Sequence, residues 1–223
     1  MPFIGRTPTP VPLTSSDIPD SIITDAKIVG MTSSKLSGAL PAISGASLTG
    51  ISTDFVKLSS ATASNSASIP FDLNVSTYDN FLILGHKMRP ASDATEFYMY
   101  FSEDSGSSYL STTMYSGRDY VKLTGGQSTG AEQNDLSGGV QLGSDLGNDK
   151  DGSCQIWLYG MANAHTGANK FCNATLTAGH ESADYTWNTG FICIGNNAIN
   201  NVKIAMSSGN LSTGVYTLYG FVK

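Results

Sequence analysis

The stretch TEFYMYFS, residues Thr95–Ser102, alternates between two sets of side chains along its whole length. One set is Thr95, Phe97, Met99 and Phe101, and the other is Glu96, Tyr98, Tyr100 and Ser102. Because successive side chains of a β-strand point to opposite faces, this period of two predicts a strand with one face in a core. Glu103–Gly106 follows with residues typical of a turn, so we expect the strand to end there.

Strand-like runs separated by turn signals continue on both sides of this strand, from Ala67 to the end of the chain. GVYTLYGFV at Gly214–Val222 alternates in the same way, and Asn148–Gly152 is a second turn signal. About eleven short strands without helical patterns predict an all-β head, a β-sandwich of jelly-roll-like type. The expected strands are Ser68–Leu73, Asn80–Met88, Thr95–Ser102, Ser108–Tyr115, Tyr120–Leu123, Ser137–Leu142, Ser153–Met161, Ala168–Thr177, Phe191–Gly195, Val202–Ser207 and Gly214–Val222.

The composition also favours an all-β protein. Only 13% of the 223 residues are charged, whereas glycine alone occurs 24 times. Gly, Ser, Thr and Asn form helices poorly, because glycine is too flexible and the short polar side chains compete for backbone hydrogen bonds. The net charge is −6 and no run of Lys or Arg occurs. We therefore expect neither a nucleic-acid partner nor binding to an anionic membrane surface.

Residues 13–60 differ from the rest, because single aliphatic side chains are scattered among Ser, Thr, Gly and Asp. So few apolar groups cannot form a monomeric core against the entropy cost of ordering the chain. The alternatives are disorder or winding with identical chains around a shared axis. The spacing of the aliphatic residues and the repeated Ser-Gly-Ala at 37–39 and 44–46 favour winding. We expect a homotrimer with an intertwined stalk over residues 13–65 and a head over 66–223.

Residues 1–12 contain four prolines, which predicts an extended segment with few backbone donors. Phe3 and Ile4 are its large apolar side chains before Val11, and Arg6 is its one charge. We predict that this peptide docks on a partner, with Phe3 and Ile4 as apolar plugs and Arg6 facing an acidic pocket. A disordered leader is the alternative. The segment lacks the apolar core of a signal peptide, and no run in the chain is long enough for a membrane span.

The three cysteines, Cys154, Cys172 and Cys193, show no Cys-x-x-Cys spacing. Two of them lie in apolar, strand-like runs, so we expect buried free thiols, with one disulfide as the alternative.

Residues that carry catalysis or bind metals are not gathered in any known pattern. His86, His165 and His180 do not pair at metal-ligand spacing. Asp145, Asp149 and Asp151 suggest a calcium loop but lack the EF-hand pattern, and Glu103-Asp104 lies in a turn. Neither a Gly-x-Ser-x-Gly elbow nor a P-loop occurs. We expect no catalytic residue, no metal and no cofactor.

Aromatic residues offer a possible contact with sugars. Nine aromatic side chains of interest fall in the expected head: Tyr98, Tyr100, Tyr109, Tyr115, Tyr120, Trp157, Tyr159, Tyr185 and Trp187. Most belong to strands, where a core position is the simpler interpretation. Trp187 lies in the polar stretch Ser182–Gly190, which we interpret as a loop. Trp187 is therefore the candidate for an exposed ring that contacts a glycan.

Several stretches resemble the tail-fibre and virion-appendage proteins of marine and cyanobacterial phages. They are Met1–Arg6, Asp17–Ile28, Ser34–Ile43, Leu48–Ile51, Tyr78–Leu84, Phe101–Tyr109 and Val202–Lys223. The resemblance covers about 40% of the chain and implies a trimer in the virion, with its N-terminus docked on the particle and a distal head. Assembly would take place in the cytoplasm of the bacterial host.

The expected function is thus that of a structural fibre or spike, not of an enzyme. Its partners would be its own copies, other tail or capsid proteins and, in an adhesive role, a host surface polysaccharide. One alternative is a capsid decoration or head-fibre protein that stabilises the shell. A glycan-degrading enzyme is the lowest alternative, because the repeated coils of a parallel β-helix, which such phage enzymes use, are absent from the sequence.

Overall fold

The structure is a computed structural model, and it describes residues 55–111, 114–123, 129–136, 138–165, 168–179 and 183–222. Within these ranges the chain forms twelve β-strands and no helix. Every strand pairing is antiparallel. The expectation of an all-β protein is confirmed for the described residues. The expected stalk, at residues 13–65, lies outside them up to residue 54.

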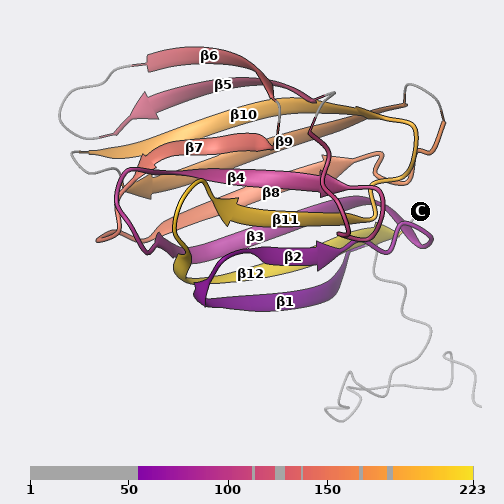
Figure 1. Ribbon diagram of the computed structural model, residues 1–223, viewed down its shortest axis with the longest axis horizontal. Coiled ribbons are helices and arrows are strands. Elements are labelled where there is room, and N and C mark those ends of the chain that lie inside the picture. The colour runs from indigo at the N-terminus through magenta and orange to yellow at the C-terminus, as the bar shows by residue number, and fades with distance from the viewer. Residues whose placement is uncertain are drawn as a thin grey trace, which may run out of the picture. The chain divides into compact units, whose positions relative to one another are not determined.

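The strands form two sheets, and Figure 1 shows the smaller sheet lying over the larger one. The larger sheet contains, in spatial order, β1 (Phe55–Ser66), β12 (Leu211–Val222), β3 (Tyr78–Pro90), β8 (Gly152–Tyr159), β9 (Ala168–Gly179), β10 (Asp184–Gly195), β5 (Met114–Lys122) and β6 (Thr129–Leu136). The smaller sheet contains β2 (Ile69–Asp72), β11 (Asn201–Met206), β4 (Thr95–Ser102) and β7 (Val140–Leu146).

Strands from the beginning of the described chain pair with strands from its end, and the pairs are nested in chain order. β1 pairs with β12, β2 with β11, β3 with β8 and β4 with β7. This pairing of first strand with last is the strand order of a jelly roll. The remaining strands form two pairs, β5 with β6 and β9 with β10, which extend the larger sheet on one side beyond β8. In Figure 1, β5 and β6 lie beyond β7, the edge strand of the smaller sheet.

The core lies between the inner faces of the two sheets. In β4, Phe97, Met99 and Phe101 are fully buried, while Tyr98 and Tyr100 remain half-buried on the other face. Burial of one face therefore explains the alternation from which this strand was predicted, and β4 has the predicted bounds. The opposing face supplies further fully buried side chains from β3, β8 and β12: Phe81, Ile83, Ile156, Leu158 and Leu218.

Two strands were not expected from the sequence. β1 was placed in the stalk, yet it pairs along β12 as the edge of the larger sheet. Of its residues only Ala63 is buried, so an apolar alternation is missing. β6 was also unexpected, and residues 108–111 of the expected strand Ser108–Tyr115 form a loop instead. An edge strand needs few apolar residues, because its ladder with one neighbour holds it in place.

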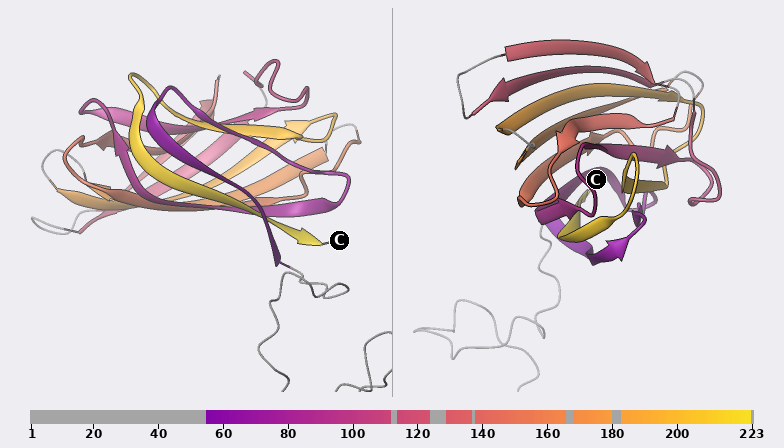
Figure 2. Two further views of the ribbon diagram at one scale, coloured as in Figure 1. Left: turned by 90° about the horizontal axis from the view of Figure 1, so that it is seen from below. Right: turned by 60° about the vertical axis from the view of Figure 1, so that its left-hand side comes forward.

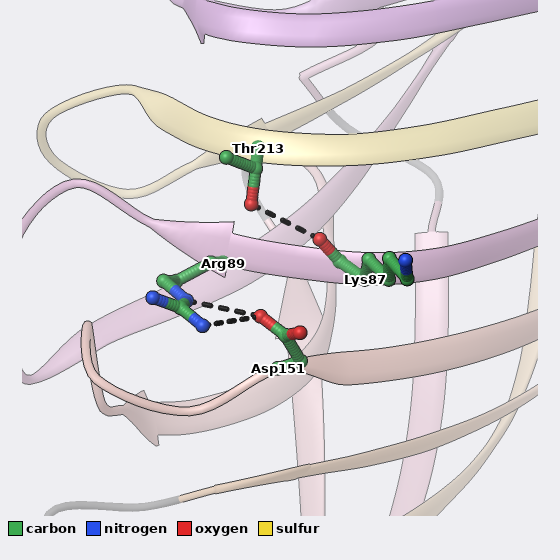
Figure 3. Close-up of polar contacts among 4 residues, drawn as sticks. All are labelled: Lys87, Arg89, Asp151 and Thr213. Carbon is green, nitrogen blue, oxygen red and sulfur yellow. Dashed lines mark hydrogen bonds and ion pairs between the residues drawn. The ribbon is translucent and has the colours of Figure 1, made fainter.

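Polar contacts hold the C-terminal end of β3 in place (Figure 3). Lys87 has a left-handed φ of 53° at an irregularity between His86 and Met88, and its carbonyl oxygen accepts from the Thr213 hydroxyl at 3.1 Å. Arg89 donates to Asp151 Oδ1 through Nε at 3.0 Å and Nη2 at 2.6 Å. Both side chains are substantially exposed, so this ion pair contributes only about 0–1 kcal/mol.

Gly85 of β3 provides a test of the packing between β3, β8 and β12. A Cβ at this position would lie 2.7 Å from Cys154 Sγ and 2.9 Å from the Tyr216 ring, whereas a Cβ at Gly117 of β5 would meet nothing within 4 Å. We predict that Gly85→Ala lowers the free energy of unfolding by about 1–3 kcal/mol, because the added methyl overpacks the core. Gly117→Ala should change it by less than about 0.5 kcal/mol. Urea titration of both variants decides, and equal effects would contradict this account of the core.

Candidate functional site

A groove of about 440 Å³ lies on the outer face of the smaller sheet, where β2 and β11 run side by side. The loop that follows β4 forms one of its walls. The lining residues are Ser68, Pro70, Asp72, Ser105, Gly106, Tyr109, Asn201 and Lys203. Strand alternation places β2 side chains there, since Pro70 and Asp72 are exposed while Ile69 and Phe71 are buried. The groove therefore uses the polar face of the strands whose other face is the core.

Lys203 lies against two tyrosine rings inside the groove. Its Nζ is 4.0 Å from the centre of the Tyr109 ring and 4.8 Å from that of Tyr100. Such cation–π contacts are worth about 0.5–2 kcal/mol each, depending on exposure. Tyr100 is also closely approached by Gly139, where a Cβ would lie 2.7 Å from the ring. The ammonium group and the rings are thus held in place before any ligand arrives.

Asn201 lies beneath the groove and connects its two sides. The Asn201 amide is almost fully buried; its Nδ2 donates to Asp72 Oδ1 at 2.7 Å, and its Oδ1 accepts from the Tyr109 hydroxyl at 3.1 Å. Burial, reinforced by the negative charges of Asp72 and Asp104, raises the pKa of Tyr109 above its usual value. The Tyr109 hydroxyl therefore stays protonated at neutral pH and remains a donor.

The loop that forms the groove wall is held by the Asp104 carboxylate. Its Oδ1 accepts from the Ser108 backbone N–H at 2.8 Å and from the Ser102 hydroxyl at 2.7 Å, and its Oδ2 accepts from the Ser108 hydroxyl at 2.6 Å. Ser105 and Gly106 have left-handed φ values of 59° and 83°. The N–H of Ser105 donates to Asn200 Oδ1 at 2.8 Å, which joins the loop to the start of β11. The wall of the groove is therefore rigidly built.

The groove combines polar groups of several kinds that can bind a polar ligand. It presents an ammonium group, hydroxyl groups, a carboxylate and aromatic rings on one open surface. Asp72 is the only carboxylate among the lining residues. Glycoside hydrolysis uses a pair of carboxylates, so the groove lacks the basic requirement for that reaction. Within the described part of the chain, no group of three His, Cys, Asp or Glu side chains is placed to hold a metal ion.

Trp187 is not the exposed ring that the sequence suggested. It is only 2% exposed, on the inner face of β10, and stacks on Tyr185 with ring centres 5.4 Å apart. The stretch Ser182–Gly190 was interpreted as a loop, yet β10 begins within it at Asp184. Thr186 and Asn188 occupy the alternate outer positions, and this polar alternation made a strand resemble a loop.

The cysteines are free and buried, which confirms the expected thiols. Burial raises the pKa of Cys154 to about 12 and that of Cys193 to about 11, and it also raises the pKa of Cys172. Because the thiolate is the reactive form, these thiols are poor nucleophiles.

The remaining candidate residues are dispersed or lie outside the described ranges. His86 and His165 are both exposed on the head, and His180 falls outside the described residues. Of the acidic cluster at 145–151, Asp151 is engaged by Arg89. Phe3, Ile4 and Arg6 of the predicted anchor also lie outside the described residues.

The groove residues themselves were missed by the sequence analysis, except that Tyr109 was noted among the aromatic side chains. Asp72 and Asn201 are 129 positions apart in the chain, and only the register of β2 on β11 brings them together. Local sequence patterns carry no signal for such a pairing.

No family model, curated protein or solved structure matches this chain. Within the described residues, no helix is long and apolar enough to cross a membrane. The structure defines an antiparallel all-β fold of two sheets with jelly-roll strand order.

Acid titration tests the account of the groove wall. Hydrogen bonds from the Ser108 hydroxyl, the Ser108 N–H and the Ser102 hydroxyl hold the pKa of Asp104 down, from 3.8 to about 2. A carboxylate with a lowered folded-state pKa stabilises its loop above pH 3.8 and loses that effect as pH falls through about 2. We predict that the Ser108 amide NMR signal shifts with a midpoint near pH 2 and that Asp104→Asn abolishes the transition. A midpoint near 3.8 would contradict the hydrogen-bonded wall.

Proposed function

We propose that this chain is a structural protein of a bacteriophage particle, a short trimeric fibre or spike with an N-terminal attachment and a distal head. The observation that carries the proposal is the junction at Phe55. There an all-β head with buried aromatic residues begins, directly after a long segment too poor in apolar side chains to fold alone. A fibre needs these two parts in this order: a stalk that is ordered by its own copies and a head that folds independently.

The strand order of the head is consistent with this role. Jelly rolls occur in viral capsid proteins and in lectins, among other proteins. A fold alone does not define a function, so this is support by analogy only. The resemblance of Met1–Arg6 and Asp17–Ile28 to phage appendages adds the virion location, the trimer and the docked N-terminus. A capsid decoration or head-fibre protein is the alternative site on the same particle.

The attachment is tested by replacing the apolar plugs of the N-terminal peptide. We predict that Phe3→Ser combined with Ile4→Ser removes the protein from phage particles, because the peptide loses the side chains that fill its docking site. Thr7→Ser combined with Thr9→Ser is the matched control and should be incorporated normally. Immunogold electron microscopy and quantitative blotting of purified particles measure both, and circular dichroism checks that the head still folds. Normal incorporation of the first variant would overturn the anchor assignment.

A second role, adhesion to a host surface polysaccharide, is favoured by the groove on the smaller sheet. Sugar hydroxyls require several fixed donors and acceptors, and an aromatic surface to pack against the ring. The groove presents Asp72, Ser105 and Lys203 beside Tyr109, on a wall that the Asp104 contacts keep in shape. Lys203 and Asp72 place one charge of each sign in the groove, so it fits a saccharide whose hydroxyl groups both donate and accept.

The adhesive role predicts a specific loss on substitution of Lys203. We expect Lys203→Ala to weaken binding of a host polysaccharide about tenfold or more, which corresponds to about 1.4 kcal/mol. Lys87→Ala removes another exposed lysine and should leave binding unchanged. Isothermal titration with purified host polysaccharide compares the two variants. Equal affinity of both variants and the parent would exclude the groove as the adhesive site.

A further inference from the structure

The outer face of the larger sheet is polar over much of its area but aromatic at one end. In its polar part, Thr175 contacts Asn188 and Thr177 contacts Thr186 through side-chain hydrogen bonds of 3.2 and 3.0 Å. The aromatic end lies where β1 begins and β12 ends, and Figure 2 shows these two strand ends next to each other. We call this row the aromatic stripe, made of Phe55, Phe221, Trp157, Tyr159, Phe171 and Tyr115.

The rings of the stripe lie on β1, β12, β8, β9 and β5, and Asn80 of β3 and Ile192 of β10 occupy the positions between them. At one side Phe55 and Phe221 are paired residues with ring centres 4.9 Å apart, and Trp157 lies 5.5 Å from Phe221. Trp157 stacks on Tyr159 with an interplanar angle of 3°. Tyr159 is paired with Phe171 in the strand register.

The last part of the stripe passes through Ile192. This residue is paired with Phe171 on one side and with Tyr115 on the other. At about 4.8 Å per strand the row is roughly 30 Å long.

These rings are unusually exposed for apolar side chains. Phe171 is 52% exposed, Tyr115 50%, Phe55 42% and Tyr159 41%. They make up most of the exposed large hydrophobic residues among the described part of the chain. An antiparallel sheet normally turns polar residues to solvent, and single exposed rings need no explanation. Four such rings along one end of the same face do need one, and we interpret them as part of a surface that another body covers.

The connection to residues 1–54 indicates which body this is. The undescribed part of the chain joins the head at Phe55, and Phe55 is itself the first member of the stripe. In a trimer whose stalks share one axis, threefold symmetry places the three copies of Phe55 at the same height along that axis. Because the stripe begins at the residue where each chain enters its β-structure, a neighbouring copy is the body that we expect to cover it.

We propose that the aromatic stripe is the surface through which each head contacts a neighbouring copy in the trimer. The inference rests on the proposed trimeric fibre. About 30 Å by 10 Å of apolar surface is near 300 Å², well below the roughly 800 Å² per partner of a stable interface. The heads alone therefore associate weakly, and the stalk holds them at high effective concentration so that the stripe of each head meets the next head. The contact is heterologous and closes as a ring of three.

Introduced cysteines can measure this contact in the full chain, because the native thiols are buried and unreactive. Phe171→Cys places a thiol in the stripe. Leu123→Cys is the matched control, since Leu123 has the same 52% exposure but lies beyond the opposite end of β5. We expect maleimide to label the thiol of Phe171→Cys at least tenfold more slowly than the thiol of Leu123→Cys. A benzophenone coupled at position 171 should cross-link two chains, with the attachment mapped to residues 52–223 of the neighbour.

The outcomes separate the two proposals. A monomeric mass for the full chain in sedimentation equilibrium would overturn the trimeric fibre and the stripe contact together. A trimer in which positions 171 and 123 react equally fast would overturn the stripe contact alone. So would a cross-link that forms within one chain or that maps to residues 1–51, because the stripe would then be covered by the stalk segment. A protected thiol with a cross-link between heads supports the proposal.

Discussion

The head depends on the pairing of β12 with both β1 and β3, which joins the last strand of the chain to two of the first. Tyr216 of β12 is fully buried and packs where Gly85 of β3 and Gly214 leave no room for a side chain. Once these strands are in register, β11 must cross to the other sheet and lie beside β2. The groove and the aromatic stripe are both results of this closure, since each combines residues from the two ends of the head.

The sequence predicted those features that a single strand encodes locally. β4 was found at its true bounds, because burial of one face leaves an apolar residue at every second position. β1 was missed, because an edge strand with only Ala63 buried leaves no such pattern. Trp187 was misplaced for the opposite reason: polar residues on the outer face of β10 hid a strand whose inner face is buried. The groove was out of reach, because strand register joins Asp72 to Asn201 and nothing local records register.

The two surfaces of the head differ in the physical basis of what they can bind. The groove on the smaller sheet is polar, and its hydrogen bonds are already arranged around Asn201, so it suits a hydrophilic ligand that exchanges with solvent. The stripe on the larger sheet is apolar and open, so it suits a permanent contact that stays dry. The proposed fibre would use these two surfaces toward different neighbours. The separation onto opposite sheets lets the two operate without competing for the same residues.

The added strand pairs β5–β6 and β9–β10 have a consequence for how such heads diverge. The added pairs extend the larger sheet on one side only, and β9 and β10 also pack on the smaller sheet, where the Phe191 ring lies 5.6 Å from that of Phe101. Insertions, deletions or exchanges in β5–β6 or β9–β10 leave the pairing order of the eight nested strands unchanged. Phe171 and Tyr115 nevertheless lie on these added strands. Loss or exchange of β5–β6 alone would remove Tyr115 from the stripe and leave the residues that line the groove in place.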